Sequence, residues 1–271
     1  MKFGFESEKI LYDTKSKKVS STSLRTLLAL EDYKIIYGDA DINRVTGEFV
    51  HNMIEMSSSP TSSVFEVARD YLHSYELVKE VSARNQRKML PMGSYPLAFK
   101  PTMVSKWQYY VQNAILSNNA EMGWDINPTH GLYFGANCAG VHIHGEIQTL
   151  PEYLSLTTEL RDKHNLGVAL APLNAFAASP YFEGRHEGVS MRTLRYYFGV
   201  YEKFPEFGGI PPMAETSTDL LKHYRDSMAS WMEKGVALGF DPQEINLLAH
   251  KHGANWGMVR WNRKWNTVEM R

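Results

Sequence analysis

Two glutamates near the amino terminus have the side chains and the spacing to bind a metal ion. Glu6 and Glu8 lie in the segment FGFESEKILYD, whose apolar residues indicate a β-strand over residues 2–12. Side chains alternate across a strand, so both carboxylates share a face, roughly 6–7 Å apart. Two buried like charges repel each other unless one takes up a proton or a cation binds there. The alternative is an edge strand whose glutamates face water.

A second strand-like segment carries imidazole and carboxylate groups on one face. In GVHIHGEI, His142, His144 and Glu146 alternate with aliphatic residues, which would pack on the opposite face. Imidazole and carboxylate together are typical ligands of zinc, manganese or iron. The alternative is a polar sheet face that is exposed to solvent.

Two further segments each place a carboxylate within an apolar strand. Glu55 is flanked by Ile54 and Met56, and Glu269 lies two residues before Arg271 in TVEMR. As structural residues, Glu55 would lie at a sheet rim, and Glu269 would form an ion pair with Arg271. In the functional interpretation both glutamates bind metal, and the Arg271 guanidinium binds a phosphate beside them.

A glycine-containing loop, SPYFEGRHEGVSMRTLRYY, gathers basic side chains. They are Arg185, His186, Arg192 and Arg195. Such a cluster suits phosphate or carboxylate recognition, and the alternative is a solvated basic loop. The chain contains no GxxxxGK[ST] motif, no GxGxxG after a strand and no GxSxG, so a P-loop, a dinucleotide fold and a nucleophile elbow are not indicated.

The elements that must position these groups alternate irregularly along the chain. Strands are predicted over residues 2–12, 32–39, 48–58, the end of 131–147 and 265–271, and helices over 64–87, 105–118, 151–163, 166–178 and 218–236. This order lacks a steady βαβα repeat. It therefore favours an α+β fold with a mostly antiparallel, curved sheet and helices packed on one face.

The composition excludes several classes of protein. The 271 residues carry a net charge of −1, and 43% are hydrophobic, as in an ordinary soluble globular protein. No basic surface indicates nucleic acid or membrane binding, and no apolar run approaches the ~20 residues of a membrane span. The single cysteine, Cys138, excludes an internal disulfide and favours a cytoplasmic protein.

Seven motifs, taken together and in order, resemble those of carboxylate–amine ligases related to glutamate–cysteine ligase, which use a glutamine-synthetase-like catalytic fold. Each motif is short, but together they extend from residue 3 to residue 271. They are FGFESEKILYD, NMIEMSSSP, LPMGSYPLA, GVHIHGEI, NAFAASPYFEGRHEGVSMR, FGGIPP and VRWNRKWNTVEMR.

The resemblance implies an ATP-dependent carbon–nitrogen ligase that uses Mg²⁺ or Mn²⁺. A substrate carboxylate would attack the γ-phosphate of ATP, and an amine or amino acid would displace phosphate from the acyl phosphate to form an amide, such as a γ-glutamyl amide. Glu269 and Arg271 would be catalytic, and Arg185 and Arg192 would contact ATP or substrate. The implied metal ligands are Glu6, Glu8, Glu55, His142 and Glu269.

The chain also differs from the family pattern. Ser7, Tyr95 and His186 stand where relatives often carry Glu, His and Asp, and the sequence stops where relatives commonly continue with helices. We therefore expect a single ligase catalytic domain over residues 1–271, lacking that C-terminal helical part, whose uncovered sheet favours a homo-oligomer.

Two alternative functions remain open at this point. The first is a metal hydrolase built on His142, His144 and Glu146, which would act without ATP. The second is a non-catalytic or partner-dependent relative that binds a nucleotide or an amino acid.

Overall fold

The structure of the chain is a computed structural model. It describes residues 1–21, 23, 27, 44–95, 97, 99, 101–122, 138–148, 153–176, 181–182, 185–186, 207–252, 257–263 and 265–271. The strand predicted over residues 32–39 lies outside these residues.

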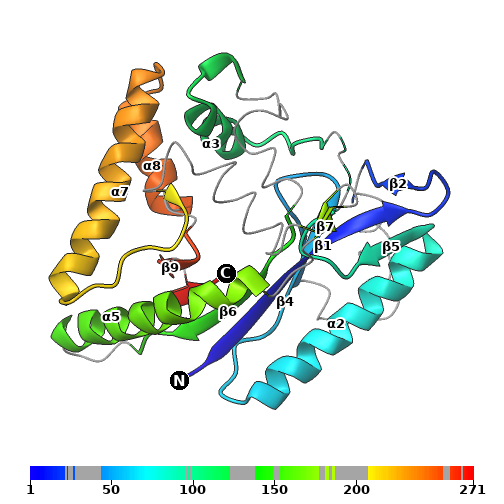
Figure 1. The fold of residues 1–271 in the computed structure, drawn as a ribbon, viewed down its shortest axis with the longest axis horizontal. Coiled ribbons are helices and arrows are strands. Elements are labelled where there is room, and N and C mark those ends of the chain that lie inside the picture. The colour runs from blue at the N-terminus through cyan, green and yellow to red at the C-terminus, as the bar shows by residue number, and fades with distance from the viewer. Residues whose placement is uncertain are drawn as a thin grey trace.

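An antiparallel sheet forms the centre of the described part of the chain (Figure 1). Strand β1 (Phe3–Asp13) pairs with four others, and every pairing in the sheet is antiparallel. The other strands of this sheet are β2 (Lys18–Val19), β3 (Val45–Gly47), β4 (Met53–Ser57), β5 (Arg87–Leu90), β6 (Val141–Glu146), β9 (Val259–Asn262) and β10 (Thr267–Met270). The main path across it runs β3-β4-β1-β6-β10-β9. This arrangement confirms the predicted α+β fold with an antiparallel sheet.

The helices follow most of the predicted boundaries. They are α2 (Val64–Arg84), α3 (Trp107–Ser117), α5 (Tyr153–Leu170), α7 (Ser217–Ala237) and α8 (Pro242–His252), with 3₁₀ turns η2 (Ala120–Met122) and η3 (Ala171–Phe176). A short separate hairpin joins β7 (Tyr181–Phe182) to β8 (Arg185–His186). Ser63 caps α2 by accepting from the Glu66 N–H, and Thr216 with Asp219 forms a capping box at α7.

One helix prediction was wrong. Separate helices were expected over residues 151–163 and 166–178, but α5 continues without a break from Tyr153 to Leu170. Gly167, in the last turn of this helix, allows close packing on the sheet, because a Cβ there would lie 2.8 Å from a Val259 methyl group and 3.1 Å from Met270 Cγ. Helix α8 and strand β9 were not predicted.

The two faces of the sheet carry different side chains. One face, which we call the outer face, packs Leu11, Ile54 and Met56 against α2, and Val259 and Val268 against α5. Alternation places Glu6, Glu8 and Ile10 on the opposite face, which we call the site face. Figure 1 shows α2 and α5 along one side of the sheet.

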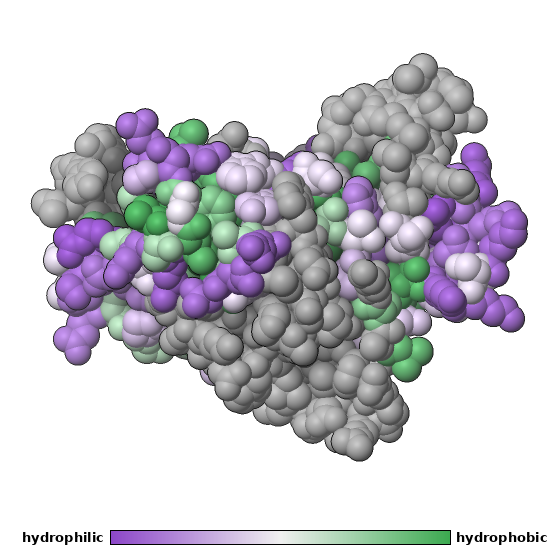
Figure 2. All heavy atoms as spheres, turned by 90° about the horizontal axis from the view of Figure 1, so that it is seen from above, coloured by the Kyte–Doolittle hydropathy of each residue, from purple (hydrophilic) through white to green (hydrophobic). Residues whose placement is uncertain are grey.

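Helices α3, α7 and α8 lie toward the site face (Figure 1). Their buried side chains pack around Ile10 and Met53 and include Val111, Trp231 and Ile245. Seen from above, hydrophilic side chains dominate the end of the sheet at β2 and β5, and apolar side chains gather at the surface over α7 and α8 (Figure 2). No helix among the described residues is long and apolar enough to span a membrane.

Candidate active site

The register of the central strands brings predicted metal ligands together on the site face. Glu6 of β1 lies directly opposite His142 of β6, and Glu8 lies directly opposite Glu55 of β4. Opposing residues of paired strands share a face, so these four side chains lie side by side. Because β1 is paired along both edges, the alternative of an edge strand with water-facing glutamates was wrong.

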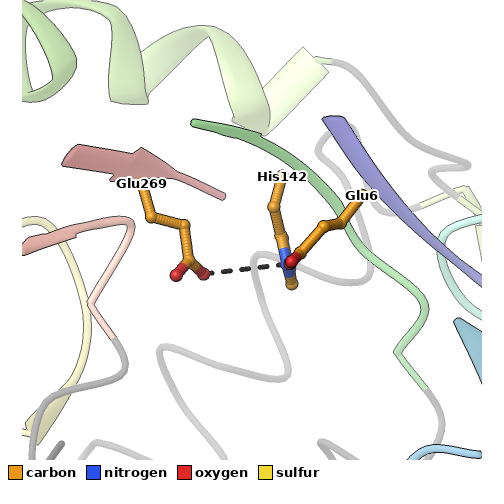
Figure 3. A group of neighbouring side chains, drawn as sticks. All are labelled: Glu6, His142 and Glu269. Atoms are coloured by element: carbon orange, nitrogen blue, oxygen red, sulfur yellow. Dashed lines mark hydrogen bonds and ion pairs between the residues drawn. The ribbon is translucent and has the colours of Figure 1, made fainter. Parts of the chain in front are cut away.

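The first cluster consists of Glu6, His142 and Glu269, which converge from β1, β6 and β10 (Figure 3). One potential ligand atom from each lies within 4.8 Å of the others. His142 Nδ1 is 3.3 Å from Glu6 Oε2 and 3.7 Å from Glu269 Oε1. Glu269 is fully buried and His142 is 3% exposed. The alternative of a solvated polar sheet face was therefore wrong for these residues.

The charges around the first cluster favour ionised carboxylates and a neutral imidazole. Burial would raise the pKa of Glu6, but hydrogen bonds with His142 and His144 outweigh it and lower the pKa to about 2. Burial likewise opposes ionisation of Glu269, yet nearby guanidinium groups hold its pKa well below the ordinary value. Burial and the charge of Arg271 lower the pKa of His142. These are the protonation states in which carboxylates and imidazole bind metals.

The second cluster consists of Glu8, Glu48 and Glu55, again with ligand atoms within 4.8 Å of one another. The Gly140 N–H donates to Glu8 Oε2. Burial and the charge of Glu8 raise the pKa of Glu48 to about 7. Burial, Glu48, Glu6 and Glu8 together raise the pKa of Glu55 to about 10. Three acids therefore crowd a site whose oxygen atoms are the ligands that hard divalent cations prefer.

Glu48 was missed by the sequence analysis. A continuous strand over residues 48–58 would place Glu48 and Glu55 on opposite faces, because they are seven positions apart and only residues an even number of positions apart share a face. The chain instead turns at residues 51–52, and β4 begins only at Met53. The two carboxylates then come together, and the Glu48 side chain hydrogen-bonds Glu55. Alternation alone could not have identified this ligand.

Two arginines adjoin Glu269. Arg271, predicted as a phosphate-binding residue, places Nε 3.2 Å from Glu269 Oε1 and 3.3 Å from His142 Nε2. Arg260, which the sequence analysis did not select, places Nε 2.9 Å from Glu269 Oε2. Arg260 lies directly opposite Glu269 in the β9–β10 pairing, a relation that depends on a hairpin not predicted from the sequence.

Other predicted site residues lie apart from both clusters or outside the described structure. Glu146 accepts a hydrogen bond from the Lys2 N–H at 2.9 Å and belongs to neither cluster. A site built on His142, His144 and Glu146 is therefore not formed; His144 instead pairs with Glu6 at 3.1 Å. The side chain of Arg185 and the whole of Arg192 lie outside the described part of the chain.

The comparisons with known proteins agree with the fold. A search of curated proteins found no match. A bifunctional glutathione synthetase from Pasteurella multocida superposes with a TM-score of 0.62 at 14% identity, over 100% of this chain and 35% of that one. A glutamate–cysteine ligase from Francisella tularensis, solved in complex with AMP, gives 0.51 at 12% identity, over 100% of this chain and 60% of that one.

The present chain therefore spans 35% and 60% of the lengths of these two proteins. At such low identity the two structures establish the shared fold, a mixed α+β architecture around an antiparallel sheet. The family assignment comes from the sequence as a whole. Residues 2–271 match glutamate–cysteine ligase family 2. With its fold and nearly its full length in agreement, the chain belongs to glutamate–cysteine ligase family 2.

Proposed function

We propose that the chain is an ATP-dependent carbon–nitrogen ligase, which activates a carboxylate as an acyl phosphate and transfers the acyl group to an amine. One observation carries the proposal: the two clusters share strand β1 and lie beside Arg271 on one buried sheet face. Phosphoryl transfer depends on charge neutralisation and in-line positioning rather than on a covalent nucleophile. The carboxylates, the imidazole and the arginine on this face are suited both to charge neutralisation and to positioning of the reactants.

The donor sets of both clusters fit divalent metal ions. The first cluster offers carboxylate and imidazole, and the second offers carboxylates alone. Glu269 Oε1 is buried and accepts no hydrogen bond from the described residues, although it lies near Arg271. Glu6, His142 and Glu269 would hold one ion, and Glu8, Glu48 and Glu55 a second. Mg²⁺ or Mn²⁺ bound there would neutralise the charge of the ATP phosphates.

The surrounding protein groups support the same chemistry. The Arg271 guanidinium is placed to receive the negative charge of the transferring phosphoryl group. Arg185 and Arg192 remain proposed contacts for ATP or substrate. The Francisella enzyme was solved with AMP, which supports an adenine nucleotide as ligand here.

The remaining parts of the proposal concern partners and setting. The proposed substrates are small molecules, an amino acid or another carboxylate and an amine, and a γ-glutamyl amide is one such product. Neither nucleic acid nor membrane is a proposed partner. We further propose a cytoplasmic protein that self-associates.

The test is ADP release from ATP in the presence of Mg²⁺ or Mn²⁺ and pooled amino acids. Glu269→Gln should abolish amino-acid-dependent release, since it removes a ligand charge from the first cluster. Glu146→Gln is the matched control, because Glu146 lies on the same sheet face but outside both clusters. Binding of ATP without ADP release would overturn the ligase and favour a nucleotide-binding relative without catalysis.

A further inference from the structure

The buried carboxylate of Glu269 is held by two donors from one neighbouring strand. Arg260 Nε donates to Glu269 Oε2 at 2.9 Å, and Asn262 Nδ2 donates to the same oxygen at 3.1 Å. Both donors lie on β9, where Arg260 is directly opposite Glu269 and Asn262 is directly opposite Thr267. The pairing register therefore delivers both side chains to the same edge of the carboxylate.

The other oxygen faces the first cluster. Glu269 Oε1 lies 3.7 Å from His142 Nδ1 and forms an ion pair with Arg271 Nε at 3.2 Å, but it accepts no hydrogen bond from the described residues. With Oε2 occupied by two donors, rotation of the carboxylate out of its plane would break both hydrogen bonds of a fully buried side chain. An unsatisfied buried carboxylate oxygen or guanidinium is costly, so the observed orientation is strongly preferred.

We propose that Arg260 and Asn262 are positioning residues that fix Glu269 so that only Oε1 is presented to a metal ion in the first cluster. This inference rests on the proposed function, because it assumes that Glu269 is a metal ligand. Partners behind a ligand commonly orient it, and their loss typically weakens metal binding by roughly 10- to 100-fold. Neither residue needs to touch the metal or the substrates.

Arg260 is charged and Asn262 is neutral, so variants of the two can separate the effect of ligand orientation on metal binding from the effect of charge. The guanidinium of Arg260 repels a divalent cation, so its loss by itself would strengthen metal binding. Its hydrogen bond orients the ligand, so its loss by itself would weaken metal binding. Asn262 is neutral and contributes only orientation. Asn262→Ala is therefore the cleaner variant, and Arg260→Met shows which of the two effects of the arginine dominates.

The experiment is a titration of the folded protein with Mn²⁺ in the absence of ATP, with free Mn²⁺ followed by electron paramagnetic resonance. The binding that disappears in Glu269→Gln defines the first cluster. We expect Asn262→Ala and Arg260→Met to raise the dissociation constant of that site by about 10-fold or more. Arg260→Lys, which keeps a charged donor, should recover part of the loss.

Arg263→Met is the matched control. Arg263 is an exposed arginine of the same β9–β10 hairpin, and its guanidinium lies over the Trp261 ring at 5.2 Å. Its loss should leave the Mn²⁺ dissociation constant unchanged. Circular dichroism of every variant at the titration temperature establishes that the comparison is made between folded proteins.

The outcomes distinguish the inference from the proposed function. Unchanged Mn²⁺ binding in Glu269→Gln would overturn both, because Glu269 would then not be a ligand. If Mn²⁺ binding to the first cluster were lost in Glu269→Gln but its affinity were unchanged in Asn262→Ala and Arg260→Met, the positioning role alone would be overturned. Tighter binding in Arg260→Met would overturn the positioning role of that arginine, since its charge would then outweigh its hydrogen bond.

Discussion

Gly167 provides a sharp test of how α5 supports the strands that carry the site. Replacement of a helical glycine by alanine usually stabilises a helix by up to about 1 kcal/mol. Here an added Cβ would lie 2.8 and 2.9 Å from the two Val259 methyl groups and 3.1 Å from Met270 Cγ. Such contacts are shorter than carbon atoms tolerate, and Val259 is 1% exposed, so it has little room to move.

The expected change in stability follows from these opposing effects. Inserting a methyl group into a packed core costs about 1–3 kcal/mol. After the gain in helix propensity of about 1 kcal/mol, Gly167→Ala should lower the free energy of unfolding by up to about 2 kcal/mol. For a chain of this size each kcal/mol corresponds to about 2–4 °C in Tm. Because Val259 and Met270 adjoin Arg260 and Glu269, we also expect weaker Mn²⁺ binding.

Urea denaturation of the metal-free protein measures the effect on stability. Gly145→Ala is the control, since a Cβ on this β6 glycine would meet nothing within 4 Å. Its unfolding free energy should stay close to that of the unmodified chain. If Gly167→Ala were more stable than the unmodified chain by the full gain of about 1 kcal/mol, the close approach of α5 to β9 and β10 would be refuted as the reason for this glycine.

Three further predictions concern charge, pH and capping. Glu48→Gln should raise the Tm of the metal-free protein at pH 8, because it removes one of three crowded acidic groups. The same variant should show a smaller rise in Tm when Mg²⁺ is added, and a rise as large as that of the unmodified chain would contradict the role of Glu48 as a ligand. Burial lowers the pKa of His164 below its ordinary 6.5, so stability should fall as pH drops below that value, when the unfolded chain alone takes up a proton, by at most about 1.4 kcal/mol per pH unit. Urea denaturation between pH 7 and 5 checks this, and His164→Gln should show a smaller decline. Thr216→Ala should cost about 1 kcal/mol through loss of the α7 capping box, measured by the same denaturation.

Strand alternation predicted much of the candidate site. Glu6, Glu8 and His142 were selected because residues two apart share a strand face, and the sheet register places them together. Glu55 and Glu269 were weak candidates from their own segments. Only the order of the motifs along the chain joined the four segments into one site, and the metal-binding roles remain predictions.

The missed residues depend on relations that local patterns do not contain. Glu48 reaches the second cluster because the chain turns before β4, which breaks the alternation that a continuous strand would have. Arg260 reaches Glu269 through the β9–β10 register. The break expected between residues 163 and 166 does not occur in α5, where Gly167 packs closely against Val259. In each case the deciding contact is between segments.

The sharing of β1 between the two clusters sets the distance between them. Glu6 belongs to the first cluster and Glu8 to the second, with Ser7 alone between them on the outer face. Their Cα atoms are therefore separated by one two-residue repeat of an extended chain, about 6.6–6.8 Å. The strand backbone therefore fixes the separation between the two clusters. Inserting one residue between Glu6 and Glu8 would move one of the two carboxylates to the opposite face of the sheet. Only a change in side-chain length, as from glutamate to aspartate, could alter the spacing of the carboxylates gradually.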